Sequence, residues 1–146
     1  MRDLGTLSGE YSYLLIERVH FGQGSIGRLS DELNRLGSKR PFLVTGKTIS
    51  EQTDLCQKVE DSSGRKLAGI FSGIKQHAPQ SGILEATRQA KQANADLLVS
   101  LGGGSPIDAT KIVVKELSEN FARSALSHIA IPTTLSAAEF SHAAGM

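Results

Sequence analysis

Short apolar runs alternate with segments of helical period along this chain of 146 residues. The apolar runs predict strands at Tyr13–Phe21, Pro41–Thr45, Leu67–Ile74, Asp96–Leu101 and His128–Pro132. The segments between them predict helices at Ile26–Leu36, Ser50–Glu60, Ser81–Asn94 and Pro106–Leu117. Strands and helices that alternate in this way indicate an α/β fold, a Rossmann-like parallel sheet with helices on both faces. We expect residues 1–146 to form a single domain of this kind.

The composition excludes several classes of protein. With 16 Lys and Arg against 15 Asp and Glu, the formal net charge is +1, so we expect no nucleic-acid or membrane partner, because both need clustered positive charge. The sequence has no apolar stretch of the roughly 18 residues that span a bilayer. We expect no signal peptide, because Met1–Glu10 lacks a basic start followed by an apolar run. The single cysteine, Cys56, excludes an internal disulfide and is typical of a cytoplasmic protein.

Two glycine-containing loops match nucleotide-binding patterns only in part. Gly22–Gly27 fits the dinucleotide pattern G-x-G-x-x-G, but that pattern also needs an acidic residue about 20 positions further on. The next strand ends at Thr45–Gly46 without an acid, so a tight glycine turn is the alternative interpretation. Gly46, Lys47 and Thr48 resemble the end of a P-loop, but Pro41 stands where that motif has its first glycine. A nucleoside-triphosphatase is therefore disfavoured.

A third loop gives the most complete physical basis for phosphate binding. Three glycines at 102–104 follow the clearest strand, so no Cβ atom blocks an approach to the backbone. Ser105 is expected to cap the next helix, with Asp108 as its capping-box partner and Pro106 at the first helical position. The free N–H groups and the positive end of that helix would then attract an anion. The residues expected to hold a phosphate or pyrophosphate are Gly102, Gly103, Gly104, Ser105, Pro106, Ile107, Asp108 and Lys111.

Hydroxyl side chains follow the last predicted strand at the same edge of the sheet. Thr133, Thr134 and Ser136 are expected to contact a ribose or a phosphate. Catalytic and metal-binding patterns are scarce by comparison. No two of the four histidines are spaced three or four residues apart, and no Ser/His/Asp set or Cys-x-x-Cys pair is present. We therefore predict no catalytic residue and no metal ligand in this chain.

Four motifs occur in an order that resembles the iron-containing (group III) alcohol dehydrogenase family. They are FGQGS at 21–25, LVTGKT at 43–48, GGGSPIDATK at 102–111 and IPTT at 131–134. The similarity extends from about residue 13 to the end of the chain. A further stretch, His77-Ala78-Pro79, is similar to the maleylacetate reductase branch.

The resemblance implies that this chain is the NADP- or NAD-binding domain of such an enzyme. Gly102–Asp108 would hold the pyrophosphate and approach the nicotinamide, and the threonines and Ser136 would flank the adenine-side ribose and phosphates. In the family, a helical C-terminal domain then supplies an Asp and three His that hold iron or zinc. Hydride passes between the coenzyme and a small alcohol or carbonyl substrate, which the metal polarises. We expect the 146 residues alone to be inactive. We also expect them to form homo-oligomers, because a cut between two domains exposes apolar surface.

Two departures from the family pattern bear on the coenzyme. NAD-preferring members often end the second strand with Thr-Asp, whereas Gly46 and Lys47 stand at this place. Glycine leaves room for a 2′-phosphate and lysine attracts it, so NADP is favoured. The second departure is Ser136–Glu139, where the family has Ser/Thr-Gly-Ser-Glu, and a Cβ at Ala137 would crowd a close backbone approach.

Two other interpretations stay open. One is a non-catalytic nucleotide- or phosphate-binding module. The other is a relative of glycerol dehydrogenase or dehydroquinate synthase. The Ser105-Pro106 pair favours the alcohol dehydrogenases over these relatives.

Overall fold

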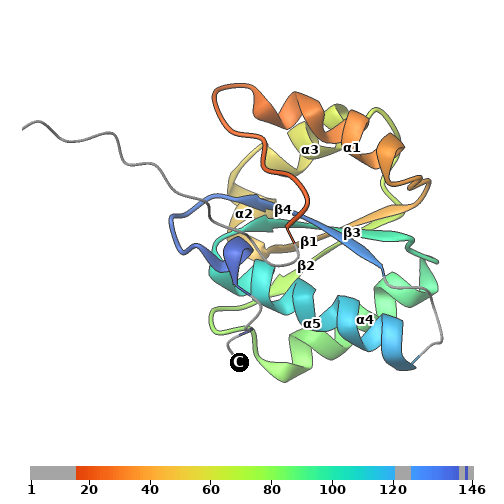
Figure 1. Cartoon of the computed structure of the whole chain (residues 1–146). Helices are drawn as coiled ribbons and strands as arrows, with labels where there is room; N and C mark the ends of the chain where they lie inside the picture. The colour runs from red at the N-terminus through yellow and green to blue at the C-terminus, as the bar shows by residue number, and fades with distance from the viewer. Residues whose placement is uncertain (1–15, 121–125, 142–143, 145–146) are drawn as a thin grey trace, which may run out of the picture.

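A parallel four-stranded sheet forms the centre of the fold. The structure, a computed structural model, describes residues 16–120, 126–141 and 144. The strand order is β2-β1-β3-β4 (Figure 1). The strands are β1 (Pro41–Gly46), β2 (Gly69–Ile74), β3 (Leu97–Gly102) and β4 (Ser127–Pro132). Every neighbouring pair runs parallel, which confirms the predicted α/β class.

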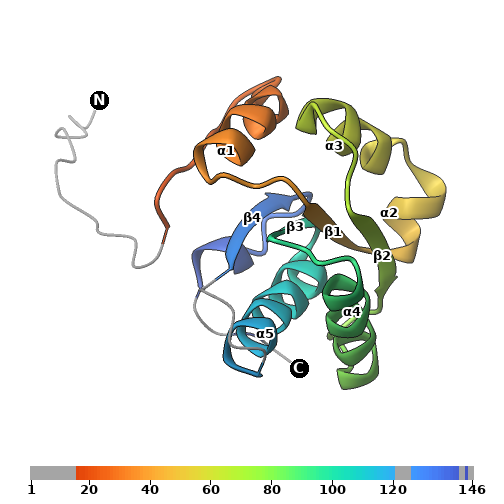
Figure 2. The same ribbon diagram turned by 90° about the vertical axis from the view of Figure 1, so that its right-hand side faces the viewer.

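Helices cover both faces of the sheet (Figures 1 and 2). They are α1 (Leu29–Arg35), α2 (Lys47–Gln52), α3 (Leu55–Ser63), α4 (Gln80–Gln92) and α5 (Gly104–Asn120). Side chains that alternate along β1 belong to opposite cores. Phe42 and Val44 pack with α4 and α5, whereas Leu43 packs with Leu33 of α1 and Val59 of α3. The apolar runs of the central strands therefore fill two cores at once.

The helix expected at Ser50–Glu60 is two helices, so that prediction was wrong. Helix α2 ends at Gln52 and α3 begins at Leu55. Between them Thr53 is extended, with φ −137° and ψ 165°. Its hydroxyl donates to the carbonyl of Ile49 at 2.6 Å and accepts the N–H of Leu55 at 3.2 Å. One side chain thus bonds to backbone groups of both helices at the break.

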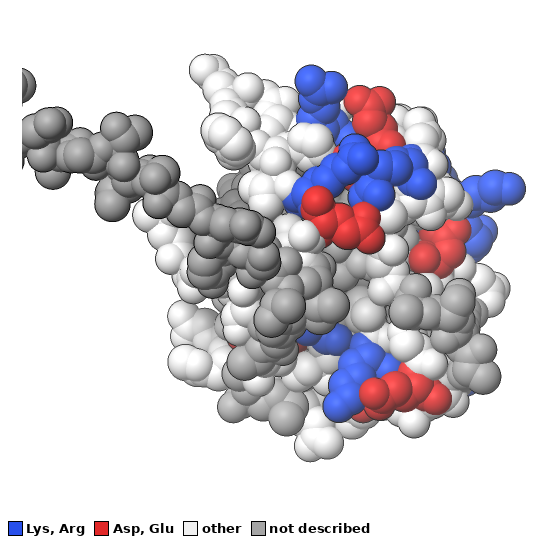
Figure 3. All heavy atoms as spheres, viewed as in Figure 1, with Lys and Arg blue, Asp and Glu red and all other residues white. Residues whose placement is uncertain are grey.

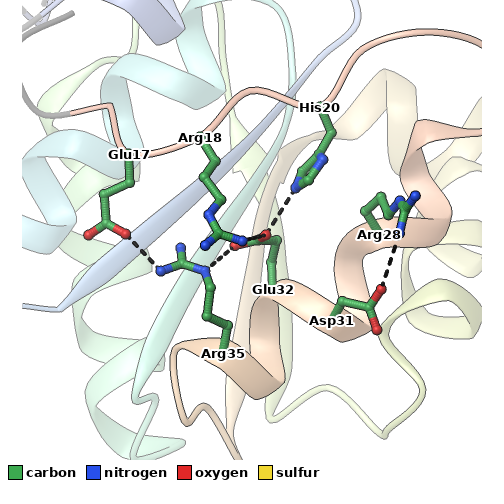
Figure 4. Close-up of polar contacts among 7 residues, drawn as sticks. All are labelled: Glu17, Arg18, His20, Arg28, Asp31, Glu32 and Arg35. Carbon is green, nitrogen blue, oxygen red and sulfur yellow. Dashed lines mark hydrogen bonds and ion pairs between the residues drawn. The ribbon is translucent and has the colours of Figure 1, made fainter.

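The first predicted strand was also wrong where the structure describes it. Ile16–Phe21 forms no strand, and residues 13–15 lie outside the described part. We call residues 16–24 the strap, because their polar side chains bind α1 instead of a neighbouring strand. Arg18 and His20 donate to Glu32, at 3.4 and 2.9 Å, and Glu17 binds Arg35 at 2.9 Å (Figure 4).

The helix expected from Ile26 begins as a short 3-10 helix, η1 (Ser25–Arg28), that continues into α1. Gly24, at φ 78°, precedes it, and Ser25 makes no capping hydrogen bond, so the predicted Ser25 cap was wrong. Gly37, at φ 68°, lies beyond its end, as predicted for a left-handed glycine.

None of the helices in the described ranges is long and apolar enough to cross a membrane. On the face shown in Figure 3, Lys and Arg side chains lie beside Asp and Glu side chains. Exposed ion pairs among the described residues include Arg28–Asp31 and Lys58–Asp54.

Candidate functional site

The carboxyl ends of β1, β3 and β4 lie side by side at one edge of the sheet. In the ladders, Thr45 pairs with Leu101, and Gly102 pairs with Pro132. The strands therefore end together at Gly46, Gly102 and Pro132. This edge brings together all three groups of predicted site residues: the β1–α2 junction, the glycine turn (residues 102–104) with the start of α5, and the threonine loop (residues 133–136).

The glycine turn has little room for side chains at Gly102 and Gly103. Gly102 has φ +145°, and a Cβ there would lie 2.8 Å from Cγ of Pro106. A Cβ on Gly103 would lie 3.2 Å from the side chain of Thr134, and one on Gly104 would lie 3.5 Å from Oγ of Ser136. A side chain at Gly102 or Gly103 would therefore have to displace its neighbours, whereas a Cβ on Gly104 would make an ordinary contact.

Helix α5 begins earlier than the sequence predicts. It starts at Gly104, so Pro106 is inside the first turn. The N–H of Ile107 donates to the carbonyl of Gly103 at 3.5 Å. The N–H groups of Gly103, Gly104 and Ser105 precede this bond, and such groups are directed outward from a helix N-terminus. The anion site expected from the sequence rests on these N–H groups and stays a prediction.

The predicted capping box at Ser105 was wrong. The Ser105 hydroxyl accepts the backbone N–H of His77 at 3.0 Å. Asp108, the expected capping partner, accepts instead from Nζ of Lys111 at 2.8 Å. Because α5 starts at Gly104, Ser105 is too far into the helix to cap it. Asp108 and Lys111 are about four-fifths buried beside the site.

The threonine loop continues the β3–β4 ladder into the site. The N–H of Thr133 donates to the carbonyl of Gly102 at 2.8 Å. Thr133, Thr134 and Ser136 are all exposed. Ala137 has φ 58°, a left-handed conformation that glycine adopts at less cost. This explains physically why the family motif has glycine where this chain has alanine.

The β1–α2 junction carries an exposed positive charge. Lys47 starts α2, and its side chain is 77% exposed, with Nζ 3.7 Å from Glu51. Gly46 lies against β2, because a Cβ there would be 3.1 Å from the carbonyl oxygen of Ile74. Since α2 follows β1 at once, no wide loop precedes Lys47 as a P-loop would need.

The first glycine motif lacks its structural context. The described part of the strap that precedes it is not a strand, whereas the dinucleotide pattern needs a strand there. Gly22 and Gly24 have φ 106° and 78°, with open space around their Cβ positions. The tight-turn interpretation fits this geometry. A shallow groove of about 430 Å³ adjoins the turn and is lined by Val19, His20, Phe21, Gln23, Gly24, Ser25 and Arg28.

Sequence reasoning missed His77, which reaches the site through its backbone. His77 and Ala78 have φ 60° and 43°, and Ala78 is fully buried. Two successive non-glycine residues with left-handed φ values are costly in energy, and they persist only where the surrounding structure holds them. The burial of Ala78 and the bond from His77 to Ser105 do so here. The signals in the sequence were the similarity of His77-Ala78-Pro79 to maleylacetate reductases and Pro79 itself, which disfavours a helical residue before it.

His128 is the second histidine near the site to which the sequence assigned no binding role. Its Nε2 lies 2.7 Å from Oγ of Ser100, which is fully buried. Burial of the imidazole, with the nearby charge of Lys111, lowers the pKa of His128 to about 4. The ring is therefore neutral at physiological pH. Among the described residues, no group of three His, Cys, Asp or Glu side chains could hold a metal ion.

Comparisons with known proteins agree with this geometry. A sequence profile of the iron-containing alcohol dehydrogenases matches residues 17–146. Maleylacetate reductase 2 of Cupriavidus pinatubonensis is 35% identical over 122 residues, which are 84% of this chain and 31% of that protein. A maleylacetate reductase of Sphingobium indicum is 33% identical, over 84% of this chain and 32% of its own length. This chain therefore spans about a third of the relatives it matches.

Solved structures share the fold. The crystal structure of maleylacetate reductase from Agrobacterium tumefaciens matches with a TM-score of 0.71 and 28% identity, over 90% of this chain and 35% of that one. Sulfoacetaldehyde reductase from Bifidobacterium kashiwanohense, solved in complex with NAD+, matches with a TM-score of 0.74 and 19% identity. The match covers 87% of this chain and 37% of that one. The profile covers nearly the whole described chain, including the glycine turn and the threonine loop. The chain belongs to the iron-containing alcohol dehydrogenase family.

Proposed function

We propose that this chain binds a nicotinamide coenzyme and is the coenzyme-binding part of an oxidoreductase. That enzyme would transfer hydride between the coenzyme and a small alcohol or carbonyl compound. The observation that carries the proposal is the glycine turn, which presents the N–H groups of Gly103, Gly104 and Ser105 at the carboxyl edge of a parallel sheet. Ligands of such sheets bind at this edge, and diphosphates bind helix N-termini.

Each neighbouring element has a proposed role in binding. The coenzyme diphosphate would lie on the glycine turn and the first turn of α5, beside Asp108 and Lys111. Thr133, Thr134 and Ser136 would contact the ribose and phosphates. Gly46 carries no carboxylate that would repel a 2′-phosphate, and Lys47 would attract one, so we propose NADP as the preferred coenzyme over NAD. The coenzyme supplies the hydride chemistry when it is bound.

The family's iron or zinc fits no cluster among residues 16–120, 126–141 and 144. We propose that the metal ligands of the enzyme lie outside these residues. The described residues alone would then bind coenzyme without turnover. A homo-oligomer in the cytoplasm is the proposed state of the protein.

Titration of the chain with NADPH, NADH, ATP and inorganic phosphate tests the proposal. NADPH fluorescence should rise on binding, and NADPH should bind more tightly than the other three ligands. Gly103→Val should weaken NADPH binding at least about tenfold, because the side chain displaces Thr134 and covers the amides. The matched control is Gly27→Val, since the Cβ position of Gly27 faces open space. Tighter binding of ATP, or binding of phosphate without any dinucleotide, would instead favour a non-catalytic phosphate-binding module.

A further inference from the structure

Two hydrogen-bonded side chains join the strands that carry the halves of the candidate site. Ser100 lies on β3, two residues before Gly102, and His128 lies on β4, four residues before Pro132. Ser100 shares the face of β3 with Leu98, which packs in the core formed by α4 and α5. The two side chains therefore meet beneath α5, at a distance of 2.7 Å.

Packing alone does not require a polar pair at this place. Ser100 is fully buried, and two apolar side chains would fill the same space without any need for a hydrogen bond. A buried hydroxyl is stable only with a partner, and His128 provides one as a neutral ring with one donor and one acceptor nitrogen. The pair thus makes the position of one strand depend on the other.

Strand β4 is the element that most needs such a connection. Among the described strands it pairs only with β3 and lies at the edge of the sheet. Its residues from Ser127 to Ile131 are half-buried, whereas every residue of β3 is buried. Contacts with the core therefore hold β4 less firmly than they hold β3.

The threonine loop directly follows β4, so the position of β4 determines where the loop lies. Thr134 lies 3.2 Å from the place that a Cβ of Gly103 would take. A shift of β4 by a few tenths of an ångström would change the spacing between the glycine turn and the hydroxyls opposite it. Such shifts in a preorganised site reduce affinity, because the bound geometry must then be restored at a cost.

Helix α5 also acts on His128 through charge. The positive charge of Lys111 on α5 adds to burial in lowering the pKa of His128. Lys111 itself binds Asp108 in the first turns of α5. A neutral imidazole does not repel Lys111, so this ion pair keeps its place beside the site.

We propose that His128 and Ser100 are positioning residues that hold the threonine loop against the glycine turn and so set the affinity for the coenzyme. The inference rests on the proposed function. Neither residue contacts the ligand in this proposal, and both act through the ends of β3 and β4.

Variants of the pair test the proposal by NADPH titration and urea unfolding. Ser100→Ala and His128→Leu should each weaken NADPH binding about fivefold or more. The double variant should bind no more weakly than the weaker of the two, because both single changes remove the same hydrogen bond. His128→Gln, whose amide can bond to Ser100, should recover most of the affinity.

A matched control separates positioning from general stability. Thr87→Ala removes another buried hydroxyl, one that donates to the carbonyl of Ile83 within α4 at 2.8 Å. It should leave NADPH affinity unchanged, whatever its effect on stability. If folded Ser100→Ala and His128→Leu bind NADPH as tightly as the unchanged protein, the proposal is overturned.

Amide hydrogen exchange gives a measurement that needs no ligand. In His128→Leu, exchange should be faster at residues 102–104 and 130–136, and Thr87→Ala should not show this change. If the unchanged protein binds no nicotinamide coenzyme, the proposed function fails. Exchange then decides the positioning role separately, and equal rates in His128→Leu and the unchanged protein would refute it.

Discussion

The hydroxyl of Thr45 donates a hydrogen bond to the carbonyl of Leu101 at 2.7 Å. Thr45 has no exposed surface, and the next residues of the two strands are Gly46 and Gly102. A contact inside the core therefore holds the β1–α2 junction beside the glycine turn. The two elements proposed to bind opposite parts of the coenzyme are coupled through this bond.

Thr45→Val should lower the free energy of unfolding by about 1–2 kcal/mol, because the shape is kept while a buried hydrogen bond is lost. Urea unfolding measures the change. Thr53→Val is the comparison, since the exposed hydroxyl of Thr53 also donates to a carbonyl, that of Ile49, but water can replace it. Equal losses in the two variants would show that burial of the Thr45 bond is unimportant.

The central strands were predictable because they are buried on both faces. A strand in such a position must be apolar at nearly every residue, and the runs at Pro41–Thr45 and Asp96–Leu101 meet this condition. The structure confirms them as β1 and β3. The packing of the glycine turn was likewise indicated by residue type, because Gly102 has a φ that other residues rarely adopt.

The wrong predictions fall where distant contacts decide the structure. An apolar run cannot show whether a neighbouring strand will pair with it, and the strap binds Glu32 and Arg35 of α1 through its charged residues instead. The Ser105 cap was plausible from local spacing alone. The N–H that Ser105 accepts comes from His77, 28 positions earlier in the chain, and local rules contain no such information.

Lys47→Gln should weaken NADPH binding about three- to tenfold and leave NADH binding unchanged, because only NADPH carries the 2′-phosphate. The present partner of Lys47 is Glu51, at 3.7 Å on an exposed surface, and exposed pairs of this kind contribute little. Lys47 is therefore available to a phosphate. Fluorescence titration with both coenzymes measures the effect.

Lys58→Gln is the matched control for Lys47→Gln. Lys58 forms the same four-residue pair, with Asp54 at 3.1 Å, but on α3. The substitution Lys58→Gln should leave the affinity for both NADPH and NADH unchanged. Parallel losses for NADPH and NADH in Lys47→Gln would contradict the assignment of Lys47 to the 2′-phosphate.

Glu32→Gln should release the strap from α1. The carboxylate accepts from Arg18, His20 and Arg35 (Figure 4). These contacts, led by the hydrogen bond from His20, lower the pKa of Glu32 from 4.5 to about 2. The stabilisation is present above pH 4.5 and should be lost as the pH falls toward 2, because the folded state then has to take up the proton.

Limited chymotrypsin digestion at neutral pH measures this release, because Phe21 is 90% exposed in the strap. Cleavage there should be several times faster in Glu32→Gln. Glu85→Gln is the control, since Arg88 and Gln89 also lower the pKa of Glu85 to about 2, but Glu85 lies on α4. Slow cleavage of the strap in both variants would mean that other contacts hold it.

His128→Leu should flatten the dependence of stability on pH between about 6.5 and 4. The pKa of His128 is lowered from 6.5 to about 4 in the folded state, by burial first and by Lys111 second. In the unfolded chain the imidazole takes up a proton as the pH falls below 6.5, while in the folded chain it stays neutral until about pH 4. Unfolding therefore binds a proton across this window, so the free energy of unfolding falls as the pH falls. Urea unfolding at pH 4.5, 5.5, 6.5 and 7.5 measures the slope, which Thr87→Ala should retain because it removes no titratable group. Parallel slopes in His128→Leu and the unchanged protein would show that His128 is not held neutral, and the hydrogen bond with Ser100 would then need another explanation.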